Sequence, residues 1–247
     1  MSSSSETNKG GPADKLLVVN ADDLGLSPGV NRGIFEAHER GIVTSASLMV
    51  RWPAAAAAAA YARSRPQLGV GLHLDFAEWA IRDDEWTRLY QVCDLDNPLA
   101  VRREVERQVE QFFHLMDRPP THLDSHQHVH QDVRVRRIAE EAARRLEVPL
   151  RHDGGGVQYC GDFYGQDEHG LPYHEGISVA SLEHVIRGIG GGVTEVACHP
   201  GYDDGLDTMY RDERATEVAS LCDPRVRRAV DEAGVRLVHF GEIGRGG

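Results

Sequence analysis

The sequence is short of several features that define common classes of protein. Its 247 residues contain only four cysteines (Cys93, Cys160, Cys198 and Cys222), and no two of them form a C-x-x-C pair. Such spacing argues against a disulfide framework or a zinc knuckle and is typical of free thiols in a reducing compartment. No apolar run approaches the roughly 18–20 residues needed to cross a bilayer, and the first residues lack the pattern of a secretion signal. We therefore expect a cytoplasmic protein.

Positive charge is also scarce. Asp and Glu total 39 against 27 Lys and Arg, which gives a formal net charge of −12. Because a nucleic-acid groove needs a basic stripe, and anionic lipid attracts basic segments, we expect neither nucleic acid nor a membrane as a partner. The sequence leaves the formation of a homo-oligomer open.

The chain divides into a short leader and one long folded region. Residues 1–14 are rich in Ser, Gly and Pro, which predicts a disordered leader. Residues 15–247 show no change in composition that would mark a second domain. A single α/β barrel often takes about 200–250 residues, so this length fits one domain.

Short apolar segments alternate with helical ones along most of this region. Strands are predicted over 15–20, 44–50, 68–74, 121–124, 148–151, 193–198 and 235–239. Helices are predicted over 29–40, 54–60, 98–116, 133–146, 178–189, 210–221 and 224–233. The alternation implies a parallel sheet, and about seven strands without a nucleotide fingerprint favour a (β/α) barrel. Two connections, 75–97 and 152–176, are predicted to be long loops.

Two adjacent carboxylates, Asp22 and Asp23, follow the first predicted strand in the segment NADDLGLSPG. Neighbouring negative charges repel each other, and a bound cation would offset that repulsion. Capping of the next helix by one of the pair is the alternative. His73, at the end of the third predicted strand, is either a ligand of the same cation or a hydrogen-bonded residue of the core.

A histidine-rich segment, THLDSHQHVH, covers residues 121–130. Neutral imidazole is the commonest ligand of zinc-like ions, so four histidines after a short strand indicate a metal site, with a solvated loop as the alternative. Not all of His122, His126, His128 and His130 can bind one ion. Asp124, two residues before His126, could orient an imidazole or could be a turn residue at the strand end.

The placement of these candidate residues relative to the predicted strands is stronger evidence for a site than any one residue alone. Asp22, Asp23, His73, His126 and His199 all fall just past predicted strand ends. In a parallel barrel the C-terminal strand ends form the face that carries active sites. Two histidines and one carboxylate leave positions open on a metal ion, which is typical of a hydrolase. An imidazole such as that of His199 could serve there as a general acid or base, or remain a loop residue.

At these motifs the sequence resembles the YdjC-like carbohydrate deacetylases. The matching segments are NADDLGLSPGVNRGI, GIVTSASLMV, GVGLHLD, PTHLDSHQHVH and ACHPGY, in the family's order within residues 16–202. The resemblance implies a single distorted (β/α) barrel related to the polysaccharide deacetylases. It also implies metal-dependent removal of an acetyl group from an N-acetylated sugar or oligosaccharide.

The resemblance further implies roles for individual residues. Asp23, His73 and His126 would bind one divalent metal ion, zinc or magnesium. Asp22 would be the general base and His199 the general acid.

The chain departs from the family pattern after His73 and in the Gly-rich segment that begins at Arg151. Aromatic side chains in these connections could stack on a sugar ring or could pack on the barrel rim. Trp79, Trp86 and Tyr164, together with Arg151, are predicted to bind substrate, and Tyr159 and Phe163 are further aromatic candidates.

Two other functions are compatible with the same residues. One is hydrolysis of another amide or of an ester, including a phosphoester, although the acidic segment 75–97 is a poor match for phosphate. The other is a catalytically inactive barrel that only binds carbohydrate. The presence of both aspartates and of every candidate ligand argues against it.

Overall fold

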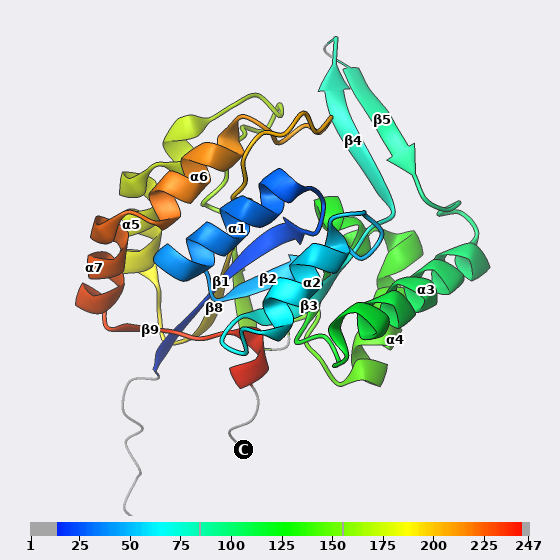
Figure 1. Ribbon diagram of the computed structural model, residues 1–247, viewed down its shortest axis with the longest axis horizontal. Helices are drawn as coiled ribbons and strands as arrows, with labels where there is room; N and C mark the ends of the chain where they lie inside the picture. Colours follow the sequence, from blue (N-terminus) through cyan, green and yellow to red (C-terminus); the bar gives the residue numbers. More distant parts are fainter. Residues whose placement is uncertain (1–13, 84, 155, 244–247) are drawn as a thin grey trace, which may run out of the picture.

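A curled parallel sheet forms the centre of the molecule in the computed structural model, which describes residues 14–83, 85–154 and 156–243 (Figure 1). The strands run in the order β6–β3–β2–β1–β8–β7, and β9 also pairs with β1. Their bounds are β1 (Lys15–Leu24), β2 (Ser45–Leu48), β3 (Gly69–Leu74), β6 (Leu123–Ser125), β7 (Val157–Cys160), β8 (Gly192–Cys198) and β9 (Val235–Leu237). All of these pairings are parallel. The half-barrel that results confirms the predicted α/β fold class.

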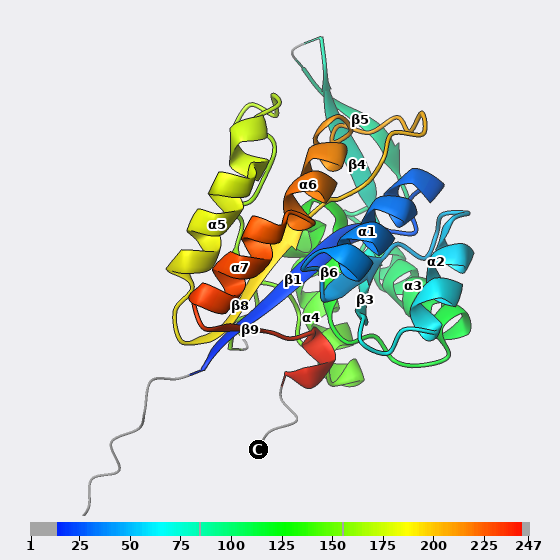
Figure 2. The same cartoon turned by 60° about the vertical axis from the view of Figure 1, so that its left-hand side comes forward.

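Seven helices among the described residues pack around this sheet (Figure 2). They are α1 (Pro28–Arg40), α2 (Ala55–Arg63), α3 (Pro98–Met116), α4 (Val133–Leu146), α5 (Val179–Gly188), α6 (Glu213–Leu221) and α7 (Pro224–Glu232). Several start at a side chain that accepts a backbone N–H, such as Ser27 before α1 and Asp132 before α4. Short 3₁₀ turns, η1 (His126–Gln131), η2 (His174–Ile177) and η3 (Phe240–Glu242), complete the fold.

Strand β1 is the axis of the sheet. It pairs with β8 from Lys15 to Ala21, and on its other side with β9 near its start and with β2 from Asn20 onward. Its residues from Leu17 to Leu24 are all buried, as expected for a parallel strand covered on both faces. The strand is longer than predicted, so Asp22 and Asp23 lie within its last residues rather than after it.

Segment 75–97 is not the loop that the sequence predicted. Its strands β4 (Ala77–Arg82) and β5 (Glu85–Gln91) form an antiparallel hairpin, which stands out from the body of the molecule in Figures 1 and 2. Most of β5 is exposed, so its residues lack the apolar alternation that reveals a half-buried strand.

The prediction also differs from the structure around strand β7 and at the start of helix α6. Residues 148–151 form only a single bridge, between Leu123 and Leu150, instead of a strand. Strand β7 lies inside the segment 152–176, which was predicted to be a loop. Helix α6 begins at Glu213, three residues later than expected.

Other predictions concern the ends and the surroundings of the chain. The leader predicted over residues 1–14 lies, apart from Asp14, outside the described residues, and the single-domain assignment remains a prediction. The four cysteines are free thiols, as expected. Within the part of the chain that the structure describes, no helix is long and apolar enough to cross a membrane.

Candidate active site

A pocket of about 310 Å³ opens where β1, β3, β6 and β8 end. Asp22 and Asp23 reach it from β1, His73 from β3, His126 from the start of η1, and His199 from the residue after β8. The structure therefore brings together the five residues to which the family resemblance assigned a catalytic or metal-binding role. Their position at the C-terminal strand ends is where barrels of this kind build active sites.

A local irregularity in β1 lets two consecutive carboxylates face the same pocket. Adjacent side chains of a regular strand point to opposite faces, but the pairing of β1 with β2 shifts between Ala21 and Leu24. Asp23 adopts a left-handed backbone with φ of 66°, which a residue other than glycine adopts only at some cost. Such irregularities re-aim side chains, and here both Asp22 and Asp23 line the pocket.

Asp23, His73 and His126 form a compact buried group. The Oδ1 atom of Asp23 lies 3.3 Å from Nε2 of His73 and 3.0 Å from Nδ1 of His126. One candidate ligand atom from each residue lies within 4.8 Å of the others. The second oxygen of Asp23 accepts a 2.7 Å hydrogen bond from Arg214, which turns Oδ1 toward the imidazoles.

The strand register explains how His73 is oriented. His73 on β3 lies beside Asp124 on β6, and its Nδ1–H donates to Oδ1 of Asp124 over 2.8 Å. This hydrogen bond leaves Nε2 facing Asp23, which is how carboxylates orient metal-ligating histidines. The imidazole that contacts Asp124 is thus that of His73, on the neighbouring strand.

The electrostatic environment of Asp23, His73 and His126 favours a positive charge. Burial disfavours a charged imidazole, but Asp124, with Asp23 and Asp22, outweighs burial and raises the pKa of His73 to about 9. Asp23 similarly raises the pKa of His126 well above its usual value. The Nε2 atom of His126 is buried and has no hydrogen-bond partner among the described residues. Two imidazoles, one of them with an unsatisfied nitrogen, and a carboxylate suit a divalent ion of the zinc type.

Asp22 belongs to a second buried network, centred on Arg151. The guanidinium donates to both oxygens of Asp22 over 2.7 and 2.8 Å. It also pairs with Asp124 at 2.9 Å and with Glu195 at 2.6 Å. Burial alone would raise the pKa of Asp22, but Arg151 outweighs burial and lowers it. Asp22 is therefore held in one orientation and stays ionised.

The role predicted for Arg151 needs correction. Its side chain is buried and does not line the pocket, so it lies behind Asp22 instead of facing a substrate. Long basic residues usually keep their charge in water, and the sequence offered no sign that three carboxylates would gather around this one.

His199 lies beside Asp22, with its Nε2 atom 3.9 Å from Oδ2 of Asp22. Its backbone N–H donates to Glu217 over 2.5 Å, and its ring packs against Tyr164 and Tyr210. Burial lowers the pKa of His199 to about 4. The ring is therefore neutral at neutral pH, and a proton that it donates has to reach it during the reaction.

The aromatic residues predicted to bind substrate occupy three different places. Tyr164 lines the pocket, together with Tyr159 and Phe163. Trp79 lines an adjoining hollow of about 820 Å³, which shares Gln127 and His128 with the pocket. Trp86, near the end of the hairpin, lines neither and is 58% exposed.

Sequence reasoning missed several charged residues of the site. Glu78, from the hairpin, places Oε2 3.7 Å from Nε2 of His126, while Arg214 and Glu217 come from α6. Helical charges of this kind are usually solvated, so no pattern in the sequence indicated them. Glu195 had a signal, because it is a lone acid within the otherwise uncharged strand GVTEVAC.

The other three histidines of the segment 121–130 are not members of the Asp23–His73–His126 group. His122 is buried under β3, where a side-chain carbon on Gly71 would come within 2.4 Å of its ring. It stacks on Phe240 and contacts Ser47, and burial lowers its pKa to about 4. These contacts are those of a core residue. His128 and His130 belong to a separate cluster with His152.

The fold and the pocket together define a parallel half-barrel with a histidine–carboxylate site at its strand ends. The family model described as YdjC-like protein matches residues 16–232. The chain belongs to this YdjC-like family, as the sequence motifs indicated.

Two relatives match nearly their whole length. A carbohydrate deacetylase of Geobacillus stearothermophilus is 36% identical over 93% of this chain and 98% of its own. A chitooligosaccharide deacetylase of Serratia marcescens is 31% identical over 93% of this chain and all of its own.

Solved structures support the fold. A protein of Enterococcus faecalis, provisionally assigned to cellobiose-phosphate cleavage, has a TM-score of 0.72 at 27% identity and covers 92% of this chain and 98% of its own. A family 4 carbohydrate esterase of Streptomyces lividans, solved with acetate, has a TM-score of 0.51 at 12% identity and covers 92% of both chains. The second likeness shows a shared fold, as predicted for a relative of the polysaccharide deacetylases.

Replacing Arg151 with leucine should destabilise the protein strongly. The change leaves Asp22, Asp124 and Glu195 buried without their shared cation, and removing one partner of a buried ion pair typically costs about 3–5 kcal/mol. Arg134→Leu is the matched control, because Arg134 pairs with Asp132 and Asp96 at the surface, where a pair contributes about 0–1 kcal/mol. Urea unfolding measures the free energy of unfolding of both variants. Equal losses of that free energy in the two variants would contradict the importance assigned to Arg151.

Proposed function

We propose that this protein removes the acetyl group from an N-acetylated sugar or oligosaccharide in a reaction that depends on one divalent metal ion. The observation that carries the proposal is the convergence of Asp23, His73 and His126 with Asp22 and His199 in one pocket. The deacetylase names of the full-length relatives support the substrate class.

Asp23, His73 and His126 would hold the metal ion. When bound, a divalent ion polarises the acyl carbonyl and lowers the pKa of water. Imidazole ligands favour zinc and its neighbours, whereas magnesium prefers oxygen ligands. The ligand set therefore favours zinc over magnesium.

Asp22 would serve as the general base. The pairing with Arg151 keeps it ionised and fixes its direction, so it can accept the proton of a water that attacks the acyl carbon. A proton taken up by Oδ2 lies close to Nε2 of His199, 3.9 Å away in the resting site.

His199 would carry this proton to the leaving group. The attack forms a C–O bond, and the C–N bond then breaks as the nitrogen takes a proton, so that a free amine and acetic acid result, and the acid ionises to acetate. An amine cannot leave without that proton. Because the His199 ring is neutral at rest, passage of the proton from Asp22 to His199 supplies the acid within one turnover.

Tyr164 and Tyr210 flank His199 and offer a ring face on which the sugar can stack. Arg214, the arginine of the pocket lining, is committed to Asp23. Among the described residues of the lining no arginine or lysine is uncommitted, so the pocket is a poor match for the charge of a phosphoester.

The adjoining hollow under the hairpin would receive the next sugar of an oligosaccharide. Trp79→Ala should then raise KM for N-acetylated oligosaccharides about threefold to tenfold, the value of one stacking contact, with little change for a monosaccharide. Trp86→Ala is the matched control, because Trp86 belongs to the same hairpin but lines neither cavity. Steady-state kinetics on a series of chain lengths measure this, and equal effects of the two variants would contradict the placement.

Acetate release from a panel of N-acetylated mono- and oligosaccharides, with and without added zinc or magnesium, tests the function. We expect metal-dependent release from at least one of these sugars. Metal binding without turnover on any member would instead favour an inactive carbohydrate-binding barrel, and turnover only on other amides or esters would favour a different hydrolase.

A further inference from the structure

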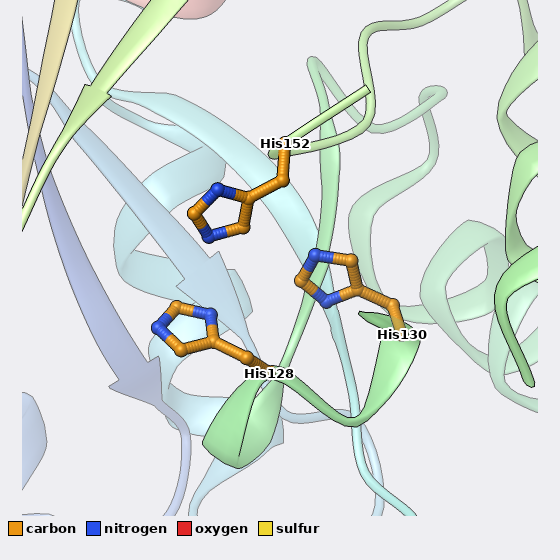
Figure 3. A group of neighbouring side chains, drawn as sticks. All are labelled: His128, His130 and His152. Atoms are coloured by element: carbon orange, nitrogen blue, oxygen red, sulfur yellow. The ribbon is translucent and has the colours of Figure 1, made fainter. Parts of the chain in front are cut away.

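A second group of histidines lies next to the pocket. His128 and His130 belong to η1, and His152 belongs to the segment before β7. The three rings turn toward one another (Figure 3), and one nitrogen of each lies within 4.8 Å of the others. This group shares no residue with Asp23, His73 and His126.

The hydrogen bonds of His130 are those of a metal-ligating histidine. A carbonyl oxygen can only accept, so the 3.0 Å contact between Nε2 and the carbonyl of Arg151 places the proton on Nε2. The Nδ1 atom therefore carries a lone pair, and a backbone carbonyl on the other nitrogen is the partner that fixes this tautomer in metal sites.

The hydroxyl group of Ser125 lies against the lone pair of the His130 Nδ1 atom. This hydroxyl lies 2.7 Å from Nδ1 and also accepts the backbone N–H of His130 over 2.8 Å. An ion bound at Nδ1 therefore has to displace the Ser125 side chain, at the cost of both hydrogen bonds.

His128 and His152 are held in unusual conformations. The Nδ1 atom of His128 is buried and has no hydrogen-bond partner among the described residues, although a buried polar atom without a partner costs stability. The backbone of His128 and that of His152 are both left-handed, with φ of 53° and 67°. Such conformations persist where the surroundings enforce them, and they are frequent at functional sites.

We propose that His128, His130 and His152 bind a second divalent metal ion of the zinc, nickel or copper class. Three neutral imidazoles suit these ions and not magnesium, and they leave a fourth position open to water. Ligand nitrogens of a tetrahedral zinc ion lie roughly 3.3 Å apart, so the group has to contract, which the exposed His152 can accommodate. This proposal goes beyond the proposed function and does not rest on it.

The surroundings of the three histidines leave an ion a path from solvent and pair the nearest cationic side chain with carboxylates. His130 and His152 border a shallow surface hollow, which opens the site to solvent from the side away from the active pocket. The nearby guanidinium of Arg151, which would repel an ion, is paired with three carboxylates, Asp22, Asp124 and Glu195. A bound ion would tie η1 to the segment before β7 and fix His128, which lines the active pocket.

Zinc stoichiometry tests the proposal. The metal-stripped full chain, dialysed against zinc chloride and analysed by mass spectrometry of the metal, should bind two equivalents. His152→Asn should bind one, because asparagine tolerates the left-handed backbone but lacks the imidazole. His169→Asn is the matched control, since His169 is an exposed loop histidine outside both groups, and it should keep both equivalents.

A variant of the first group separates the two sites. His73→Ala should retain one equivalent, which the double variant with His152→Asn should lose. With cobalt as the probe, the visible absorption of His73→Ala should also disappear on adding His152→Asn. Equal zinc content in the wild type and His152→Asn would overturn the second site, whatever the total that the wild type binds. A single equivalent that His152→Asn loses and His73→Ala keeps would instead support the second site and contradict the first. His152→Asn alone keeps the test decisive if His73→Ala fails to fold.

Discussion

Replacing His73 or His126 with alanine should remove one equivalent of bound metal and lower turnover by about 10³-fold or more, because a bound ion supplies several kcal/mol of transition-state stabilisation. Each substitution deletes one of two imidazoles that lie within 3.3 Å of Asp23. Metal content after dialysis, with circular dichroism to verify folding, measures the effect.

His122→Ala is the matched control for this prediction. His122 is a buried histidine of the same segment, but it packs between Gly71 and Phe240, away from the pocket. Its loss should affect stability and leave the metal content unchanged. Full metal occupancy in both His73→Ala and His126→Ala would refute the assignment of these ligands.

Asp22→Asn and His199→Ala should retain the metal while turnover falls by roughly 10²–10⁴-fold, the usual contribution of a positioned acid or base. The two variants should differ in substrate dependence. Without the base, attack on any acyl group slows. Without the acid, amides suffer most, because the leaving group of an activated aryl ester departs without a proton.

The comparison of an N-acetyl sugar with an aryl acetate therefore separates the two roles. His199→Ala should keep far more esterase than amidase activity, whereas Asp22→Asn should lose both alike. The neutral resting state of His199 sharpens this expectation, because its proton has to come from Asp22. If His199→Ala lost ester and amide activity equally, His199 would not be the acid that protonates the leaving group.

Much of this site could be predicted from the sequence because its residues sit at strand ends. Asp22, Asp23, His73, His126 and His199 follow apolar segments whose carboxyl ends must meet on one face of a parallel sheet. Asp124 was predicted to orient an imidazole because it stands two residues before His126, but its pairing with His73 depends on the register of β3 and β6.

The rest depended on contacts between segments far apart in the chain. Arg151 and Glu195 are 44 residues apart and meet only inside the folded sheet. The hairpin that supplies Glu78 and Trp79 has a mostly exposed second strand, so no apolar alternation revealed it. The bulge that turns both Asp22 and Asp23 toward the pocket has no local signal, because it arises from the pairing of β1 with β2.

The measurement that bears most directly on the central claim is acetate release from an N-acetylated chitooligosaccharide by metal-stripped and metal-restored protein. The His152→Asn variant is the best material, because it reports the Asp23–His73–His126 group alone. We predict that chelation abolishes acetate release and that one equivalent of zinc restores it. Undiminished release by the metal-stripped protein would contradict a metal-dependent deacetylase.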